Sequence, residues 1–272
     1  MRLSAIHTYP VKGCHRLDHD DASVEPWGLA GDRRWMVVDA DGVGVTQREV
    51  TDLVRLRAVP RDGGLTLRAA GHTDLDVAAP TGGESLPVRT FSNRKLPVPA
   101  LPAGPAADDW LGRLLGRPVR LVHLARPTRH IPADDREHDT GDQVSFADAY
   151  PLLLANTASL DALNGWLADA GEPPVPMTRF RPNLVVRGAP AWAEDDWVGR
   201  TLRVGGVRFR AAGPCDRCVV TTTDQETGVR GKEPLRTLAR HRNVAQKLLF
   251  GLHLVPVDTG QVAVGDEVSV PS

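Results

Sequence analysis

Short apolar runs that alternate with turn-forming residues most constrain the fold of this 272-residue chain. In its first 125 residues, apolar stretches flank the pairs Asp41-Gly42 and Gly63-Gly64. Glycine readily adopts the positive backbone φ angles that tight hairpin turns require. The pattern therefore predicts hairpins at both pairs and a mainly β first half.

The second half continues with strand-like runs. The segments rich in β-branched or alternating residues are NLVVRG, TLRVGGVRFRAAG and CVVTTTD. These residue types favour a pleated sheet over a helix. The closing segment GLHLVPVDTGQVAVGDEVSV is typical of a hairpin that turns through Asp258-Thr259-Gly260. Because strands dominate both halves, an open parallel sheet built from repeated strand-helix units is not expected.

Two segments interrupt the strands with helical spacing. Residues 106–116 place Trp110, Leu111 and Leu114 on one face, and Gly116 can end the helix. Residues 159–171 repeat leucines at about one helical turn and also end in glycine. The predicted fold class is therefore mainly β with short helices (α+β).

A polar, charge-dense stretch, ARPTRHIPADDREHDTGDQ, separates the two halves. Domains commonly contain about 100 to 200 residues, so we predict one domain over residues 1–130 and a second over residues 131–272. The formal net charge is -1, which offers no general attraction to nucleic acid. We find neither an apolar run long enough to span a membrane nor the apolar core of a signal peptide, and we expect a cytoplasmic protein.

Two of the three cysteines, Cys215 and Cys218, form a C-x-x-C motif with Asp216 and Arg217 between them. Structural zinc normally takes four protein ligands, and we find no second paired motif. A thioredoxin-type dithiol requires a turn from strand to helix, whereas this motif leads into the strand-like VVTTTD. Free cysteines are often simply small buried hydrophobes. Because a nearby cation favours the thiolate, one cysteine could instead be the single protein ligand of a soft metal centre.

Polar clusters elsewhere could bind the organic part of such a cofactor. Arg181 and Asn183 directly precede an apolar strand, Lys12 lies beside Gly13, and Arg33 lies in a glycine-rich turn. Arginine, lysine and backbone amides suit an anionic phosphate, although neither the lysine segment nor the glycine-rich turn matches a P-loop. Each cluster could equally be a solvated basic turn. The histidines show no HExxH spacing and the sequence has no G-x-S-x-G elbow, so a hydrolase is not favoured.

Taken together and in order, these motifs resemble the MOSC family, named after the C-terminal domain of molybdenum cofactor sulfurase. The segments that carry the resemblance are YPVKGC, GDRRWMVVD, FADAYPLLLAN, FRPNLVV, CDRCVVTTTDQETG, KEPLRTLARHR and VGDEV. The resemblance covers nearly the whole chain, and within the family it is nearest to the amidoxime-reducing components and their bacterial counterparts. It implies an N-terminal β-barrel-like domain followed by a MOSC-type β-barrel domain.

The resemblance also implies a molybdenum cofactor, in which a pyranopterin that carries a phosphate holds the metal. In the family the second cysteine of the motif binds the metal, which here is Cys218, so Cys215 would be its neighbour. The remaining roles implied are phosphate binding by Lys12 and Arg33, pterin contacts by Asp148, Tyr150, Arg181 and Asn183, and a catalytic position for Asp216 beside the metal-bound sulfur. Gly13 and Arg217 complete the predicted cofactor-binding set. Some relatives have serine at the positions of Gly13 and Asp216.

The activity that the resemblance implies is reduction of N-oxygenated compounds, such as N-hydroxylated amidines or hydroxylamines. The sequence has no dinucleotide fingerprint and too few cysteines for an iron-sulfur cluster, so we expect electrons from a separate ferredoxin, flavoprotein or cytochrome. The alternatives are a sulfur-carrier or cofactor-maturation protein that uses a Cys218 persulfide, and a module that stores the cofactor without turnover. We expect one cleft between the two halves to bring together Cys218, Arg181, Asn183, Lys12 and Arg33.

Overall fold

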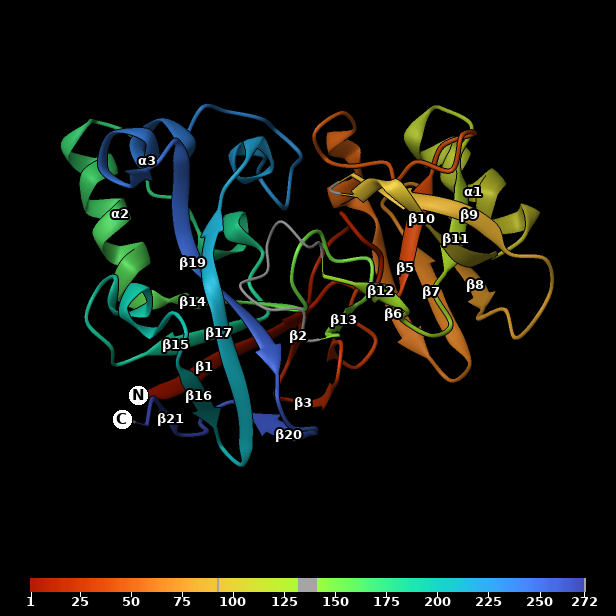
Figure 1. Cartoon of the computed structure of the whole chain (residues 1–272). Coiled ribbons are helices and arrows are strands. Elements are labelled where there is room, and N and C mark those ends of the chain that lie inside the picture. Colours follow the sequence, from red (N-terminus) through yellow and green to blue (C-terminus); the bar gives the residue numbers. More distant parts are fainter. Residues whose placement is uncertain (92, 132–140, 272) are drawn as a thin grey trace.

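A curled nine-stranded sheet forms the larger half of the protein, which we describe from a computed structural model that covers residues 1–91, 93–131 and 141–271. Figure 1 shows this sheet on the left. In spatial order its strands are β2 (Leu17–His19), β1 (Arg2–Thr8), β15 (Leu184–Arg187), β14 (Leu152–Asn156), β19 (Lys247–Pro256), β17 (Val207–Asp216), β16 (Thr201–Val204) and β21 (Val268–Ser269), with β18 (Asn243–Val244) on β19. All pairs are antiparallel except β14 and β15.

The sheet curls until its last strand reaches its second. The N–H of Leu3 donates to the carbonyl of Asp266, and the N–H of Val268 donates to the carbonyl of Met1. One isolated bridge joins Arg2 to Glu267, so the sheet has the curvature of a barrel without a continuous closing ladder. The inward-facing side chains form one apolar core, because alternate residues of a strand point to the same face.

Most of the first 29 residues belong to this larger half, whereas Val11 and Cys14 pack into the core of the other half. Besides β1, the strands β3 (Asp21–Glu25) and β4 (Gly28–Leu29) pair in a three-stranded sheet with β20 (Gly260–Ala263). The prediction of a hairpin through Asp258-Thr259-Gly260 is therefore wrong. β20 turns away from β19 and pairs with β3, because Val262 then joins Val24 in the shared core. The packing of the larger half thus crosses the predicted division at residue 130.

The smaller half, on the right of Figure 1, holds the other sheets of the N-terminal part. One consists of β5 (Trp35–Val38), β11 (Arg120–His123), β10 (Asn93–Pro102) and β9 (Leu86–Thr90), and another of β6 (Arg57–Arg61), β7 (Gly64–Arg68) and β8 (Leu75–Ala78). The β6-β7 hairpin is confirmed, with Asp62 and Gly63 as its central residues. A turn at Asp41-Gly42 is also present, closed by a hydrogen bond between Asp39 and Val43.

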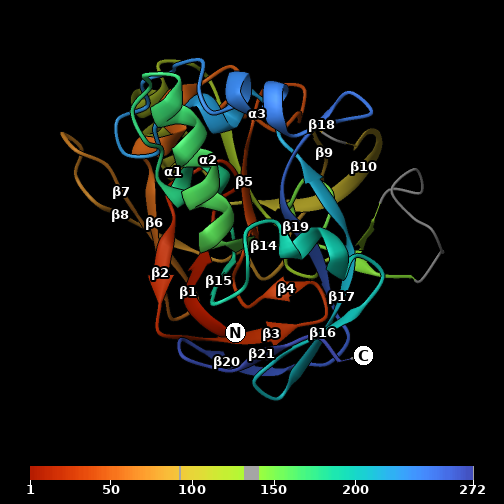
Figure 2. The same cartoon turned by 90° about the vertical axis from the view of Figure 1, so that its left-hand side faces the viewer.

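Both predicted helices are present. α1 (Pro105–Leu115) buries Trp110, Leu111 and Leu114 against the smaller half and ends at Gly116, whose φ is 65°. α2 (Thr157–Asp169) connects the parallel strands β14 and β15 and packs with α3 (Leu235–His241) over the larger sheet, as Figure 2 shows. The mainly β class with short helices is thus confirmed, although the described sheets are open and not closed barrels.

The predicted strand CVVTTTD is wrong. Residues Val219–Thr222 form a short 3₁₀ helix, η5, directly after Cys218. The hydroxyls of Thr221 and Thr222 donate to the carbonyls three residues before them, at 3.0 and 2.8 Å. Threonine side chains can compete in this way with the backbone pairing of a strand. The other 3₁₀ helices are η1 (Thr51–Arg55), η3 (Met177–Phe180) and η4 (Ala193–Trp197).

Only the ends of the charge-dense stretch between the halves can be described. Arg129–His130 forms β12, which pairs with β13 (Gln143–Val144). Residues 132–140 lie outside the described part of the chain.

The exposed turn between β18 and β19 predicts a stabilising substitution. Its central residues, Ala245 and Gln246, have φ angles of 48° and 66°. Residues other than glycine and asparagine adopt such angles at a cost in free energy. Replacing them with Asn-Gly, the preferred pair for such turns, should raise the free energy of unfolding by about 1 kcal/mol. In thermal unfolding this corresponds to a rise in Tm of about 2–4 °C, and a lower Tm would contradict the turn geometry.

Candidate functional site

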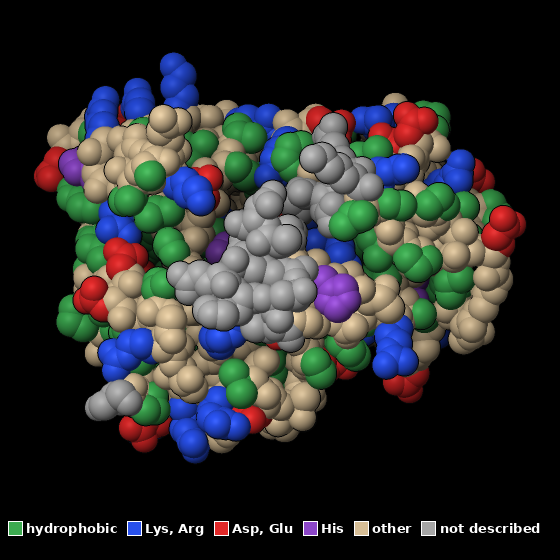
Figure 3. Space-filling model, in the orientation of Figure 1, with side chains coloured by type: hydrophobic (Ala, Val, Ile, Leu, Met, Phe, Trp, Pro, Cys, Tyr) green, Lys and Arg blue, Asp and Glu red, His purple; other side chains and the backbone are tan. Residues whose placement is uncertain are grey.

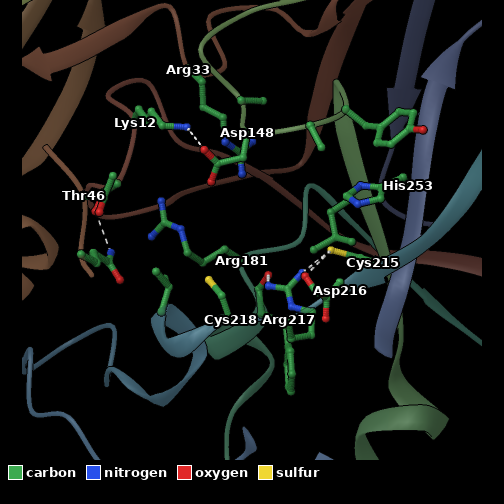
Figure 4. A pocket seen from close by; sticks show the side chains of 18 of the residues that line it. Lys12, Arg33, Thr46, Asp148, Arg181, Cys215, Asp216, Arg217, Cys218 and His253 are labelled. Carbon is green, nitrogen blue, oxygen red and sulfur yellow. Dashed lines mark hydrogen bonds and ion pairs between the residues drawn. The ribbon is translucent and has the colours of Figure 1, made fainter. Parts of the chain in front are cut away.

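A cavity of about 310 Å³ lies between the two halves, and its walls come from both of them. It is lined by Lys12, Gly13, Arg33, Asp148, Tyr150, Arg181, Asn183, Asp216, Arg217 and Cys218, which are all ten residues of the predicted site. Figure 4 shows Lys12, Asp148 and Arg181 facing the cavity opposite Arg217 and Cys215. The structure thus brings together residues that are up to 206 positions apart in the sequence, from Lys12 to Cys218.

Lys12 places a buried amine at the cavity wall. It lies shortly after β1, and its Nζ donates to the carbonyl of Phe146 at 2.7 Å and to Oδ1 of Asp148 at 2.6 Å. Burial lowers the pKa of Lys12 to about 8, although Asp148 opposes this shift. Burial by itself would raise the pKa of Asp148, but Lys12, followed by Arg48 and Arg129, lowers it to about 2. Both groups are therefore charged near pH 7.

Asn183 holds the neighbouring part of the wall through its side-chain amide. Its Nδ2 donates to the carbonyl of His7 and to Asp32, while its Oδ1 accepts from the N–H of Leu153 and from Arg33. These four bonds use all the donors and acceptors of the amide. Asn183 therefore positions Arg33, which also forms an ion pair with Asp32.

Arg181 is a partly buried cation of the cavity wall. Its φ of 54° ends η3 in the left-handed region, and its guanidinium lies 4.1 Å from the centre of the Tyr9 ring. Nη1 donates to Oε1 of Gln225 at 2.7 Å, whereas the buried Nη2 has no partner within the described residues. Burial lowers the pKa of Arg181 to about 10, so the group stays charged at pH 7. A buried donor without a partner is costly unless a ligand supplies an acceptor.

The first cysteine of the motif lies in a cationic setting. Nη1 of Arg217 donates to Sγ of Cys215 at 2.8 Å. Burial by itself would raise the pKa of the Cys215 thiol, but Arg217 and then His253 lower it to about 7. His253 stacks on the predicted site residue Tyr150, with 4.6 Å between ring centres. Cys215 therefore has considerable thiolate character at neutral pH.

The second cysteine, Cys218, lies between β17 and η5 and is partly exposed to the cavity. Nη2 of Arg48 donates to its Sγ at 3.2 Å. Asp216 is exposed, and its Oδ1 accepts the N–H of Leu248 at 2.8 Å. The thiols thus have separate partners, and the structure has no disulfide between them.

Sequence reasoning missed several residues of the cavity. Arg48 and His253 line it, and a reciprocal amide pair, Gln47 with Gln225, joins the two halves beside it at 3.1 and 2.9 Å. The side chain of Arg230 holds the same loop by donating to the carbonyl of Arg48 at 3.0 Å. His253 looked like a packed strand residue, and the segment that carries Arg48 offers no glycine-rich or cysteine pattern that could single it out.

The donor set suits a metal that the protein ligates only once. Within the described residues, no group of three or more His, Cys, Asp or Glu side chains could hold an ion by itself. The cavity instead offers thiol sulfur together with the cations Lys12, Arg33 and Arg181. Thiolate selects soft metals, and buried cations select an anionic group. A metal held mainly by an anionic organic ligand fits this combination.

Comparison with known proteins agrees with the motif order. The family model of the MOSC N-terminal beta barrel domain matches residues 1–118, and the model of the MOSC domain matches residues 141–269. Mitochondrial amidoxime-reducing component 1 of Homo sapiens is 34% identical over 285 residues, which cover 98% of this chain and 82% of that protein. Mitochondrial amidoxime reducing component 2 of Bos taurus is 32% identical over 294 residues, covering 98% and 82%.

A second group of relatives has another name. Molybdenum cofactor sulfurase of Oryza sativa subsp. japonica is 29% identical over 280 residues, which cover 93% of this chain but only 32% of that protein.

No helix within the described residues is both long and apolar enough to cross a membrane.

Proposed function

We propose that this chain, which belongs to the MOSC family, binds a molybdenum-pterin cofactor in the cavity between its halves and reduces N-hydroxylated compounds. The observation that carries the proposal is the meeting of a thiol, Cys218, with the buried Lys12 and the partly buried Arg33 and Arg181 in one cavity of about 310 Å³. A phosphate-bearing pterin that holds a soft metal needs both kinds of group. The names of the amidoxime-reducing relatives support the choice of reaction.

The predicted roles can be assigned to the cavity residues as follows. Cys218 would be the single protein ligand of the metal, and Lys12 with Arg33 would bind the phosphate. The unpartnered Nη2 of Arg181 would donate to the pterin or its phosphate. Asp148 and Tyr150 would lie along the pterin, whereas Asn183 acts through Arg33 because its own bonding groups are already in use.

The two residues between the cysteines, Asp216 and Arg217, would help to position Cys218. Asp216 fixes the main chain just before it by accepting the N–H of Leu248. Arg217 donates to Cys215 and to the carbonyl of Phe180, and in this way it fixes the position of the first thiol. Interactions that orient a metal ligand commonly change metal affinity or activity by 10- to 100-fold.

The bound cofactor would supply two-electron redox chemistry, and the chain would supply position and charge. Reduction of an N–OH group consumes two electrons and two protons, breaks the N–O bond, and yields N–H and water. Lys12, with a pKa of about 8, is a cavity group suited to hold a proton. The electrons would come from a separate donor protein, as predicted from the sequence.

Metal analysis together with a dye-driven assay tests the proposal. Gently purified protein should contain close to one molybdenum and one pterin per chain. With a reduced viologen dye as donor, it should convert benzamidoxime to benzamidine. A protein that has been loaded with cofactor and retains it, yet shows no turnover, would refute the reductase and leave the storage module.

A sulfur-carrier function is the second candidate, and the thiolate character of Cys215 beside Cys218 favours it. A persulfide on Cys218 could be passed on by the attack of a thiolate on its outer sulfur. The match to a molybdenum cofactor sulfurase supports this alternative. Cyanide-releasable sulfur in stoichiometric amount, without molybdenum, would decide in its favour.

A further inference from the structure

The segment 230–247 concentrates positive charge on one exposed part of the protein. The whole chain has a formal net charge of -1, yet this segment contains a single acidic residue, Glu233. Its basic residues are Arg230, Lys232, Arg236, Arg240, Arg242 and Lys247. Figure 3 shows Lys and Arg side chains projecting from the top of the larger half, where Figure 1 places α3.

Three of these cations are available to a partner. Arg236 pairs with Glu172 and Glu233, and Arg242 pairs with Asp195. By contrast, the side chains of Lys232, Arg240 and Lys247 are exposed and have no ion-pair partner in the described part of the chain. Exposed charges of one sign steer an oppositely charged protein toward the surface that carries them.

An apolar residue lies among these charges. Val244, which directly precedes the two-residue turn between β18 and β19, is 56% exposed. Figure 2 shows β18 beside α3, and contacts join the two elements. A small apolar centre inside a polar rim is the usual composition of a protein–protein interface. We call the surface formed by Lys232, Arg240, Val244 and Lys247 the basic face.

The basic face is directly connected to the segment that carries Cys218. Leu248 follows Lys247, and its carbonyl accepts the N–H of Arg217 at 2.8 Å. Its own N–H donates to Asp216. One hydrogen bond and two peptide bonds therefore lead from Lys247 to Cys218. Val219, the residue after Cys218, is 36% exposed.

We infer that the basic face is the docking site of an acidic one-electron carrier protein, which supplies the electrons for the cavity. The inference rests on the proposed function, because only a reductase needs such a donor. Each turnover takes two electrons, so the carrier must bind and leave twice. Such transient complexes have small interfaces, and electrostatic steering sets their association rates. A site for nucleic acid or anionic lipid would have no need of the connection to Cys218.

The experiment compares two donors on the same cofactor-loaded protein. A reduced viologen dye needs no docking site, whereas two acidic carriers, a [2Fe–2S] ferredoxin and a b-type cytochrome, do. The test variant is Arg240→Glu with Lys247→Glu. The matched controls are the charge-conserving pair Arg240→Lys with Lys247→Arg, and Arg203→Glu on β16, an exposed reversal at the opposite end of the larger half.

We expect the reversal to lower kcat/KM for an acidic carrier by about 10- to 100-fold and to leave dye-driven activity within about twofold. Raising the salt concentration should weaken the wild-type reaction with the carrier and have much less effect on the variant. Both controls should behave like the wild type. The inference is overturned if neither carrier reduces a dye-active wild type, or if the reversal leaves the carrier reaction unchanged. If the cofactor-loaded wild type showed no dye-driven turnover, the proposed reductase function itself would be refuted.

Discussion

Replacing Cys218 with serine is expected to reduce bound molybdenum to less than about a tenth of the wild-type content and to abolish dye-driven reduction. Serine keeps the size of the side chain but removes the soft thiolate, which would be the protein's single ligand to the metal. Loss of a ligand should cost more than the 10- to 100-fold typical of groups that only orient one. Elemental analysis and the benzamidoxime assay on the same preparation measure both effects.

The matched control is Cys215→Ser, which removes the neighbouring thiol. Sγ of Cys215 accepts a hydrogen bond from Arg217, whereas Arg48 donates to Cys218. Because Cys215 would not be the metal ligand, its loss should leave the molybdenum content near that of the wild type. If the pattern were reversed, with the metal lost only in Cys215→Ser, the ligand would be the first cysteine of the motif. Retention of metal and activity in Cys218→Ser would eliminate the proposed site.

Replacing Arg181 with methionine should separate stability from cofactor binding. The variant loses a hydrogen bond to Gln225, but it also removes a cation whose buried Nη2 has no partner in the described residues. These effects oppose each other, and we expect the free energy of unfolding of the cofactor-free protein to change by about 1 kcal/mol or less. Cofactor affinity should fall by about 10- to 100-fold, because a charge-assisted hydrogen bond contributes about 1.5–3 kcal/mol. Denaturant unfolding and pterin release measure the two quantities.

Arg179→Met is the control for this prediction. Arg179 lies two residues earlier, is bonded to the carbonyl of Thr221 and paired with Asp224, and does not line the cavity. Its loss should leave pterin content unchanged. A large loss of stability in Arg181→Met with normal cofactor content would mean that Arg181 is a structural residue.

The fold was predictable where local pattern and tertiary packing agree. The apolar spacing from Trp110 to Leu114 predicted α1. The β6-β7 turn requires a positive φ, and Gly63 supplies it. The pattern failed where a distant partner decides the structure. β20 alternates like half of a hairpin, yet it pairs with β3, more than 230 residues earlier in the chain. In VVTTTD, hydroxyl bonds to the backbone outweigh the strand propensity of valine and threonine.

The predicted site residues could be found from the sequence because each of them lies in a short motif with unusual chemistry. Lys12, Arg181 and Cys218 could be singled out by charge, proline or cysteine context, and all of them line the cavity. Arg48 and His253 could not, since an arginine in a polar turn and a histidine in a strand are common. Their importance follows from what lies opposite them, Cys218 and Cys215, and such a pairing is visible only in three dimensions.

The pairing of β1 with both β15 and the segment before β21 has a consequence for folding during translation. A ribosome releases the residues of the smaller half well before residue 268, so that half can pack while the chain is still growing. The larger core, by contrast, must wait for its final strand, and until then β1 has an open edge. Contacts of such long sequence separation form slowly, and an unpaired edge is prone to aggregation. Part of the edge of β1 therefore stays unpaired until residues 266–268 have emerged.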